Sequence, residues 1–186
     1  MKNRLYLFVL VILTSFKPIT NDTATTINWV TMEEALELQK KNPKKIFMDV
    51  YTNWCGPCKM LDRNTFQNED VANYVNKHFY AVKFNAEGND AVTYKGQTFS
   101  NPNYNPAKAN SRNSSHQFSQ YLKVNAYPTM VFFDEQGNYI TPVTGYLKPQ
   151  QLELYLKLFQ SDKHKDMKTQ EQFSEYYKSF KATFKE

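Results

Sequence analysis

The chain contains only two cysteines, three histidines and five glycines in 186 residues. Two cysteines cannot build the dense disulfide framework of small secreted scaffolds. A zinc site would need two more ligands, and the histidines are scattered rather than paired at ligand spacing. A basic patch is also lacking, because basic residues are spread among acidic ones. Nucleic-acid binding and a metal cofactor are therefore not expected.

The two cysteines lie two positions apart in the run Trp54-Cys55-Gly56-Pro57-Cys58-Lys59, directly behind an apolar stretch. At a helix start, residues i and i+3 share one face, so the two sulfurs can approach bonding distance. The free N–H groups of the helix start favour an anionic sulfur, which lowers the pKa of the first cysteine. Cys55 is therefore the candidate nucleophile, exposed at the helix start, and the pair indicates thiol–disulfide chemistry.

Three other uses of this pair stay open. A structural disulfide would close a loop too small to restrict the unfolded chain much. A zinc site lacks its further ligands. Haem attachment needs a histidine after the second cysteine, where this chain has Lys59. Having only two cysteines, in this spacing, favours a pair that exchanges electrons over one that stabilises the fold.

The N-terminus has the pattern of a targeting segment. Lys2 and Arg4 give it a positive start, and the uncharged apolar run 5–16 is short for a membrane span. We therefore expect a signal peptide at 1–20, with no clear cleavage motif, and an exported protein that is periplasmic or extracellular. The alternatives are a buried first strand or helix and an uncleaved membrane anchor.

A capping box marks the first helix. The hydroxyl of Thr31 and the carboxylate of Glu34 can each accept a free backbone N–H, which predicts a helix to about Lys41. The residues just before it, 27–30, have the pattern of a short strand. The content of 41% hydrophobic residues is ample for a packed core.

The run 46–51 is almost continuously apolar, which is typical of a central strand buried on both faces. One carboxylate, Asp49, interrupts it. A third strand is predicted at 79–84, after the helix of the cysteine motif. Two strands separated by a helical segment of this length imply a parallel pair with a right-handed crossover.

Residues 86–117 change character, because Asn, Ser, Gly and Pro become frequent. This composition predicts an irregular loop rather than a regular element. Ser114 and Ser115 can then cap a short helix that runs through Val124. A loop this long inside a compact domain usually serves a function or is disordered.

Two further strands are predicted at 130–133 and 139–144, joined by a hairpin turn at 134–137. Pro149 opens a helix through Phe159 at a favoured first position. The tail at 161–186 has an aromatic stripe at helical spacing, which predicts an amphipathic helical extension. This helix packs on its own domain or, in the alternative, binds a partner or a second copy. The stripe comprises Phe173, Tyr176, Tyr177, Phe180 and Phe184.

The order of these elements resembles thioredoxin over 27–160. The resemblance implies a thioredoxin fold, in which a central mixed sheet of four to five strands is flanked by helices, here with an insert at 86–113. The stretches 49–59 and 64–71 look closer to the periplasmic thioredoxin-like domain of the DsbD electron-transfer proteins, although Gly-Pro between the cysteines is as in thioredoxin. The motifs behind the resemblance are the cysteine run, Asp49, Lys83, Tyr127-Pro128-Thr129 and Gly145.

The resemblance implies a role for four catalytic residues. Cys55 would be the attacking thiolate, and Cys58 the buried thiol that closes the disulfide. Asp49 would be the buried carboxylate that exchanges a proton with Cys58. Burial in an apolar strand agrees with this role, because it raises the pKa of a carboxyl group. Lys83 would be the partner of that carboxylate.

The resemblance also implies a substrate-binding surface. Pro128 would be a cis-proline opposite the disulfide, and it would leave the backbone of Tyr127 free to pair with a substrate strand. From sequence alone an X-Pro bond is usually trans, so only the family match indicates cis. The whole surface would comprise Trp54, Gly56, Pro57, Tyr127, Pro128 and Gly145.

These features predict an exported enzyme that reduces protein disulfides, with the Cys55–Cys58 disulfide as its redox centre and no other cofactor. Its partners would be protein thiols and disulfides, together with an electron donor or acceptor. The alternatives are a disulfide oxidase or isomerase with the same site, and a non-catalytic binding or chaperone module. Topology places the insert beside Cys55, because the strands ending at Tyr51 and Asn85 end at one sheet edge. We therefore expect Tyr94, Phe99 or Tyr104 to form a substrate-contacting flap.

Overall fold

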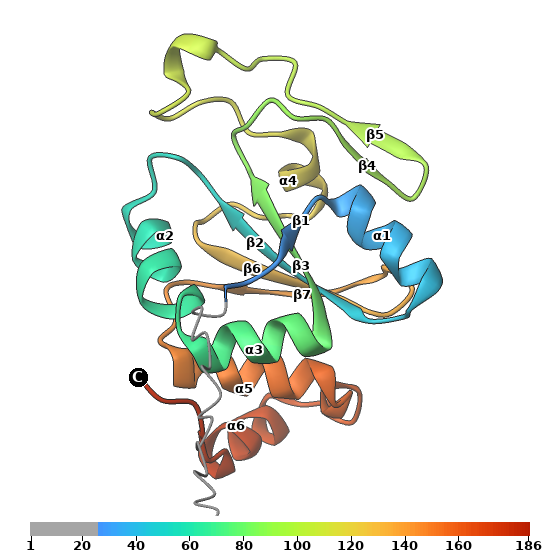
Figure 1. The fold of residues 1–186 in the computed structure, drawn as a ribbon, viewed down its shortest axis with the longest axis vertical. Helices are drawn as coiled ribbons and strands as arrows, with labels where there is room; N and C mark the ends of the chain where they lie inside the picture. The colour runs from blue at the N-terminus through green and yellow to red at the C-terminus, as the bar shows by residue number, and fades with distance from the viewer. Residues whose placement is uncertain (1–25) are drawn as a thin grey trace, which may run out of the picture.

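A computed structural model describes residues 26–186 as an α/β fold around one mixed five-stranded sheet (Figure 1). The predicted signal peptide at 1–20 lies outside the described residues. The sheet order is β1-β3-β2-β6-β7. Its strands are β1 (Trp29–Val30), β2 (Lys45–Tyr51), β3 (Phe79–Asn85), β6 (Thr129–Phe133) and β7 (Tyr139–Thr144).

Strand β2 occupies the centre of the sheet, as its apolar sequence predicts. It pairs in parallel with β3, in a register that sets Asp49 opposite Lys83. On its other side it pairs antiparallel with β6, which pairs antiparallel with β7. The parallel pair and the later hairpin are therefore confirmed, and the start of β6 lies at the same sheet edge as the end of β2.

Helices cover both faces of this sheet. They are α1 (Met32–Lys41), α2 (Gly56–Leu61), α3 (Glu69–His78), α4 (Gln117–Tyr121), α5 (Pro149–Gln160) and α6 (Gln170–Ser179). A π-helical turn at Asp62–Phe66 follows α2, and short 3-10 helices lie at Pro106–Lys108 and Lys163–Lys165. The capping box predicted for α1 is present, and α1 ends at Lys41. Phe47 of β2 packs with α3 and α5 on one face, whereas Ile46 and Met48 pack with α1 and α4 on the other. The alternation of side chains along a strand places Asp49 on the face of Phe47.

The insert is more regular than its composition predicts. It holds a β-hairpin of β4 (Val92–Tyr94) and β5 (Gln97–Phe99), which forms a second, two-stranded sheet. Val92, Tyr94 and Phe99 are buried in the core around α4. The prediction of an irregular loop at 86–117 was wrong, because these apolar side chains find long-range partners that local composition does not reveal.

The predicted cap of α4 is also corrected. The helix begins at Gln117, and His116 is the capping residue, with its Nδ1 accepting the N–H of Phe118 at 3.0 Å. Ser114 and Ser115 both precede the N-cap, and the hydroxyl of Ser114 instead donates to Asn101 at 2.7 Å. The helix ends at Tyr121, before the predicted end at Val124. His116 is fully buried, and this burial lowers the pKa of its imidazole, so the neutral ring that a cap requires is favoured.

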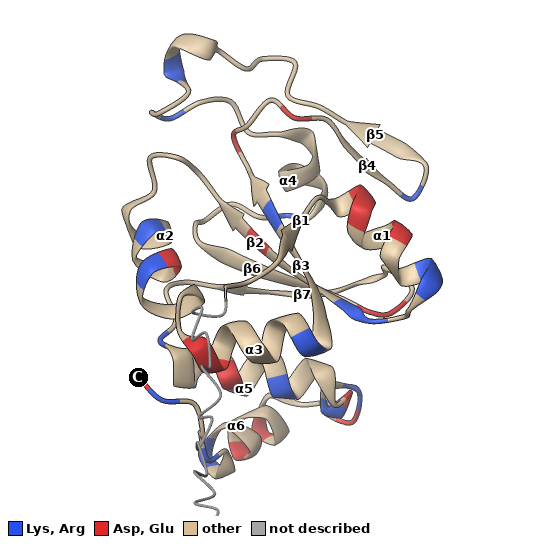
Figure 2. Cartoon of the chain, in the orientation of Figure 1, with Lys and Arg blue, Asp and Glu red and all other residues tan. Residues whose placement is uncertain are grey.

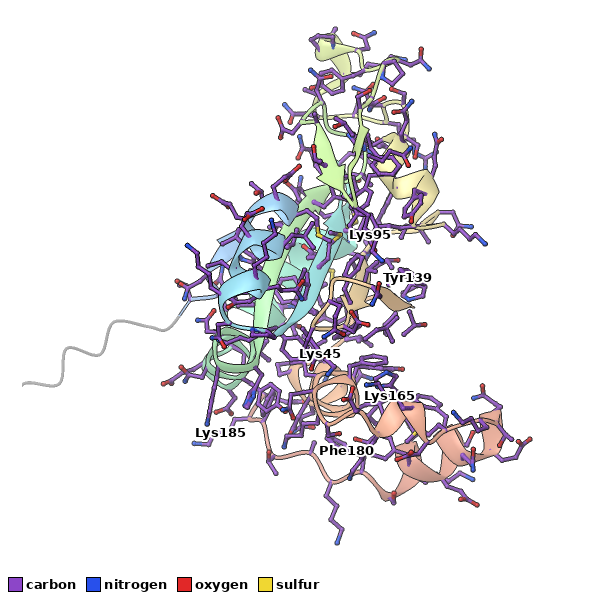
Figure 3. The ribbon with its side chains drawn as sticks, turned by 90° about the vertical axis from the view of Figure 1, so that its right-hand side faces the viewer. Lys45, Lys95, Tyr139, Lys165, Phe180 and Lys185 are labelled. Atoms are coloured by element: carbon purple, nitrogen blue, oxygen red, sulfur yellow. A yellow bond between two sulfur atoms is a disulfide. The ribbon has the colours of Figure 1, made fainter. Side chains whose placement is uncertain are left out.

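The C-terminal segment packs on its own domain, at the end of the molecule opposite to the insert (Figures 1 and 3). Its helix is shorter than predicted, since α6 ends at Ser179 and Phe180 is the C-cap. The anchor is Phe184, which joins the core beyond the helix. Buried Glu153 accepts the backbone N–H groups of Thr183 and Phe184. A fully buried carboxylate satisfied in this way fixes the last residues of the chain on α5.

Candidate active site

Cys55 and Cys58 form a disulfide, with an S–S distance of 2.05 Å and a Cα–Cα distance of 5.3 Å. Cys55 is the N-cap of α2, and its sulfur accepts the N–H of Cys58 at 3.1 Å. The first turn of α2 carries no acidic residue. The local sequence thus directs free N–H groups, and no negative charge, toward the sulfur of Cys55.

The exposure expected for Cys55 is absent in the disulfide form. Its exposed fraction is 2%, against 3% for Cys58. The two sulfurs differ instead in their surroundings. Cys55 lines a hollow with a volume of about 860 Å³, whereas Cys58 does not contribute to its wall. We call it the active-site hollow; it is lined by Trp54, Cys55, Pro57, Glu87, Arg112, Ser115, Gln120, Lys123, Val124, Asn125, Ala126 and Tyr127.

Asp49 is buried beneath the disulfide helix with an exposed fraction of 1%. Its Oδ2 lies 3.5 Å from Nζ of Lys83, and its Oδ1 has no hydrogen-bond partner among the described residues. Burial raises the pKa of Asp49 to about 7, although the nearby charge of Lys83 opposes the shift. An acid that titrates near neutral pH can both accept and release a proton there.

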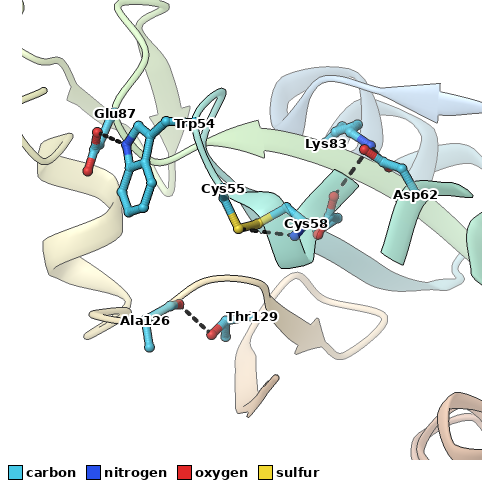
Figure 4. The surroundings of a disulfide bond; sticks show 9 residues. Trp54, Cys55, Cys58, Asp62, Lys83, Glu87, Ala126 and Thr129 are labelled. Atoms are coloured by element: carbon cyan, nitrogen blue, oxygen red, sulfur yellow. Dashed lines mark hydrogen bonds and ion pairs between the residues drawn. A yellow bond between two sulfur atoms is a disulfide. The ribbon is translucent and has the colours of Figure 1, made fainter. Parts of the chain in front are cut away.

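Lys83 bridges two acids. Besides Asp49, it forms an ion pair with Asp62, which lies in the turn that follows α2. Figure 4 shows Lys83 and Asp62 on the side of the disulfide away from Trp54 and Glu87. Sequence reasoning missed Asp62. Its signal is its position four residues after Cys58, one helical turn further along the same face.

The ammonium group of Lys83 is also surrounded by aromatic rings. Its Nζ lies 4.9 Å from the ring centre of Trp29, 5.2 Å from that of Tyr51 and 5.6 Å from that of Phe66. Aromatic faces attract a cation electrostatically. The positive charge beside Asp49 is therefore held by several neighbours and does not depend on Asp49 alone.

The segment before β6 forms the other wall of the site. The Tyr127–Pro128 peptide bond is cis, and the ring of Tyr127 meets that of Trp54 edge-on at 6.2 Å. The carbonyl of Pro128 accepts the N–H of Gly145 at 2.9 Å. Gly145 has a φ of +112°, a conformation that favours glycine. Gly145 thus supports the proline segment from behind.

The residues predicted to bind substrate therefore divide into two groups. Trp54, Pro57 and Tyr127 line the active-site hollow. Gly56, Pro128 and Gly145 are not part of its lining, and a Cβ at Gly56 would meet no atom within 4 Å. The first three residues share the lining of the hollow with Cys55. The other three belong to the backbone segments that position this lining.

The insert reaches the active site, as topology predicts. Trp54 donates its Nε1–H to Oε2 of Glu87 at 2.7 Å, and the same oxygen accepts the N–H of Asn113 at 2.7 Å. The guanidinium of Arg112 lies over the ring of Trp54, 5.0 Å from its centre. Asn53 donates to the carbonyl of Ala109 at 2.8 Å. Both ends of the insert are thus tied to the segment that carries Cys55.

The prediction that Tyr94, Phe99 or Tyr104 forms a substrate-contacting flap was wrong. Tyr94 and Phe99 have exposed fractions of 2% and 4%, and both rings pack on Phe118 in the core. Tyr104 is not part of the hollow's lining. The side chains of the insert that reach the hollow are Glu87 and Arg112, which are polar and gave no apolar pattern to detect. Removal of residues 90–110 would accordingly open the core.

A cysteine pair at a helix start, beside a buried acid and a cis-proline segment, defines a thiol–disulfide site on a thioredoxin fold. The model of the thioredoxin-like domain family matches residues 32–160, and the chain belongs to this family. Within 26–186 no group of three or more His, Cys, Asp or Glu residues is placed to hold a metal ion. No helix in this range is long and apolar enough to cross a membrane.

Comparisons with individual proteins agree with this family. The thiol:disulfide interchange protein DsbD of Pectobacterium atrosepticum is 27% identical over 124 residues, which cover 64% of this chain and 17% of that protein. The chain thus spans less than a fifth of that relative's length. A thioredoxin-fold protein from Helicobacter pylori superposes with a TM-score of 0.55 at 20% identity, over 74% of this chain and 82% of that one.

A second solved structure is more similar in sequence. It is that of a proposed disulphide isomerase from Bacteroides thetaiotaomicron, with 28% identity and a TM-score of 0.50. The match covers 73% of this chain and 93% of the other. The resemblance to thioredoxin-like proteins read from the sequence, and the fold that it implies, are therefore confirmed.

Proposed function

We propose that the chain is an exported enzyme that reduces disulfides of protein substrates with the Cys55–Cys58 pair. The observation that carries this proposal is the position of Cys55, a helix N-cap sulfur that lines an open hollow. A purely structural disulfide needs no such access. The predicted signal peptide and the match to DsbD support export.

The reaction begins with both cysteines reduced. The thiolate of Cys55 attacks one sulfur of a substrate disulfide, so that a mixed disulfide forms and one substrate thiolate leaves. The thiolate of Cys58 then attacks the sulfur of Cys55. The Cys55–Cys58 disulfide forms, the second substrate thiolate leaves, and two electrons have passed to the substrate. A dithiol partner must reduce the pair again before the next cycle.

Asp49 accepts the proton of Cys58 in the second step. Its pKa of about 7 leaves a useful fraction of carboxylate at neutral pH. Lys83 is a positioning residue that stabilises this carboxylate, and Asp62 holds the ammonium group of Lys83 in turn. Each proton transfer is then local and needs no metal ion.

Substrate binding is assigned to the wall opposite the disulfide. Tyr127 lies at the rim of the hollow directly before β6, where an extended substrate segment can pair with its backbone. Trp54 and Pro57 provide apolar surface around Cys55. This arrangement brings a substrate disulfide to the one cysteine of the pair that the hollow reaches.

A disulfide isomerase or oxidase is the second candidate, and the 28% identity to the proposed isomerase favours it. The same residues serve either direction, and the reduction potential decides between them. We expect a potential nearer to about −270 mV, the value of thioredoxin, than to about −120 mV, the value of the oxidant DsbA. The measurement is equilibration of the protein with glutathione buffers, followed by quantification of its two redox forms.

Either outcome of this titration is informative. A potential above about −180 mV, the value of protein disulfide isomerase, would overturn the role of reductant and favour the second candidate. A Cys55→Ser, Cys58→Ser double variant that keeps full biological function would overturn both and indicate a binding or chaperone module. The single variants discussed below separate the roles of the two sulfurs.

A further inference from the structure

The active-site hollow contains two cationic side chains for which the reaction has no use. Arg112 comes from the end of the insert, and Lys123 follows α4. Both side chains are exposed. Among residues 26–186, no carboxylate oxygen forms an ion pair with either of them. They share the lining of the hollow with Cys55. Two unpaired cations beside a reactive sulfur constitute a charged surface that a substrate must meet.

The one acid in this lining is already engaged. Glu87 accepts two hydrogen bonds on Oε2, from Nε1 of Trp54 and from the N–H of Asn113. It thereby holds the insert against Trp54. The ring of Trp54 in turn supports the guanidinium of Arg112 at 5.0 Å. Glu87 and Trp54 thus keep Arg112 at the hollow, and Glu87 forms no ion pair with it. With one acid and two cations, the lining keeps a formal charge of 2 − 1 = +1.

Lys123 occupies a position where the backbone favours a different residue. Its φ is +57°, and the helix end is closed there by hydrogen bonds from Lys123 to Gln120 and from Val124 to Ser119. Glycine is the usual residue at such a left-handed helix end, and asparagine is the next. A lysine could offset the helix dipole, but α4 has only five residues. A strained position that bears a charge at the rim of an active site points to a role in binding.

Figure 2 shows basic colour on the outer part of the insert and acidic colour near its beginning. The helices α1 and α3 carry both signs, with acidic residues in their first turns and basic residues in their last. The positive side of the insert is the side that returns toward α4.

We propose that Arg112 and Lys123 select protein substrates that carry acidic side chains beside the reactive cysteine. The occupant is an extended polypeptide segment, because a hollow of about 860 Å³ has room for several side chains and is lined by Ala126 and Tyr127, which directly precede Pro128 and β6. Carboxylates that flank the substrate cysteine meet the two cations while its sulfur meets Cys55. This inference rests on the proposed function and adds the class of substrate.

The test uses three peptides that each contain one disulfide-linked reporter and differ only in four flanking residues, which are all Glu, all Gln or all Lys. The full-length protein is reduced, and the second-order rate of reporter release is measured at low and high salt. At low salt we expect the Glu peptide to react about tenfold faster than the Lys peptide, since a field of complementary sign raises the encounter rate. High salt should reduce this preference.

Variants assign the preference to the two residues. Arg112→Gln and Lys123→Asn remove one charge each, and asparagine tolerates the left-handed backbone. In the double variant the Glu-over-Lys preference should fall to within about twofold. The preference is the ratio of the two rates for one protein, so a general change in reactivity cancels from it. The matched control is Lys108→Gln, which removes one charge from an exposed position of the same insert outside the lining. It should retain the preference.

Three results would overturn the selection of acidic segments. The first is equal rates with the three peptides for the natural protein, and the second is a preference that survives in the double variant. The third is an equal loss of preference in Lys108→Gln, which would show that the net charge of the protein, and not the two positions in the hollow, sets the preference. Failure of the proposed function has a different signature, since none of the peptides, including the uncharged one, would then be reduced.

Discussion

Replacing Cys55 by Ser is expected to lower disulfide reduction by at least about a thousandfold, because the attacking sulfur is lost and a serine hydroxyl does not ionise at neutral pH. Replacing Cys58 by Ser should have a different result. The first attack still occurs, but no second thiol releases Cys55, so the protein accumulates as a mixed disulfide with its substrate. Mass spectrometry of the intact adduct measures this accumulation.

The two variants control for each other, since each removes one sulfur from a buried position and both prevent the internal disulfide. A shared effect on folding would therefore lower both signals alike. Adducts on Cys58 in the Cys55→Ser variant, at the level that Cys55 forms in the other, would contradict the assignment of Cys55 as the nucleophile.

Asp49→Asn is expected to have two large effects, of which the first concerns the rate. With no carboxylate to accept its proton, Cys58 must ionise on its own. We expect release of the mixed disulfide to slow about 10- to 100-fold at or below pH 7, and the difference to shrink at high pH, where the thiol ionises unaided. Single-turnover reduction of a model disulfide across pH measures this. A variant with natural rates at pH 6 to 7 would remove Asp49 from the mechanism.

The second effect concerns stability. Folding raises the pKa of Asp49 from an ordinary value near 4 to about 7, so the folded state binds the proton more tightly than the unfolded state. The contribution of Asp49 to the free energy of unfolding should therefore be fully present below about pH 4 and be lost as pH rises through about 7. Asn cannot ionise, so the variant should be more stable than the natural protein by about 2 to 4 kcal/mol at pH 8.

Urea denaturation of the oxidised protein at pH 5 and pH 8 tests this second effect. Asp62→Asn serves as the matched control, since Asp62 also contacts Lys83 but is substantially exposed. A surface ion pair contributes little, so this control should change stability by about 1 kcal/mol or less at either pH. An Asp49→Asn variant that is less stable than the natural protein at pH 8 would contradict a buried, weakly satisfied carboxylate.

The sequence predicted the elements whose signals are local. The capping box at Thr31 and Glu34 and the apolar run of β2 each depend on neighbouring residues, and the structure places both where expected. Asp49 could be singled out for the same reason, because a lone carboxylate in such a run cannot avoid burial. The cysteine motif likewise carries its chemistry within six consecutive residues.

Other features depend on contacts between distant segments and left no such signal. The hairpin of the insert is held by packing of Tyr94 and Phe99 on Phe118, which lies well beyond it in sequence. Glu87 became part of the site only through its bonds to Trp54 and Asn113. In each case the contacting residue is distant in sequence, so the local polar or turn-rich composition does not indicate the contact.

The central claim is that Cys55, and not Cys58, is the activated thiol of a working redox pair. The most direct test is the rate of alkylation of each cysteine in the reduced protein across pH, resolved by mass spectrometry of the modified peptides. We expect Cys55 to react with a midpoint well below about 8.5, the value of a free thiol, and Cys58 to react only at higher pH. A common midpoint near 8.5 for both cysteines would contradict the account.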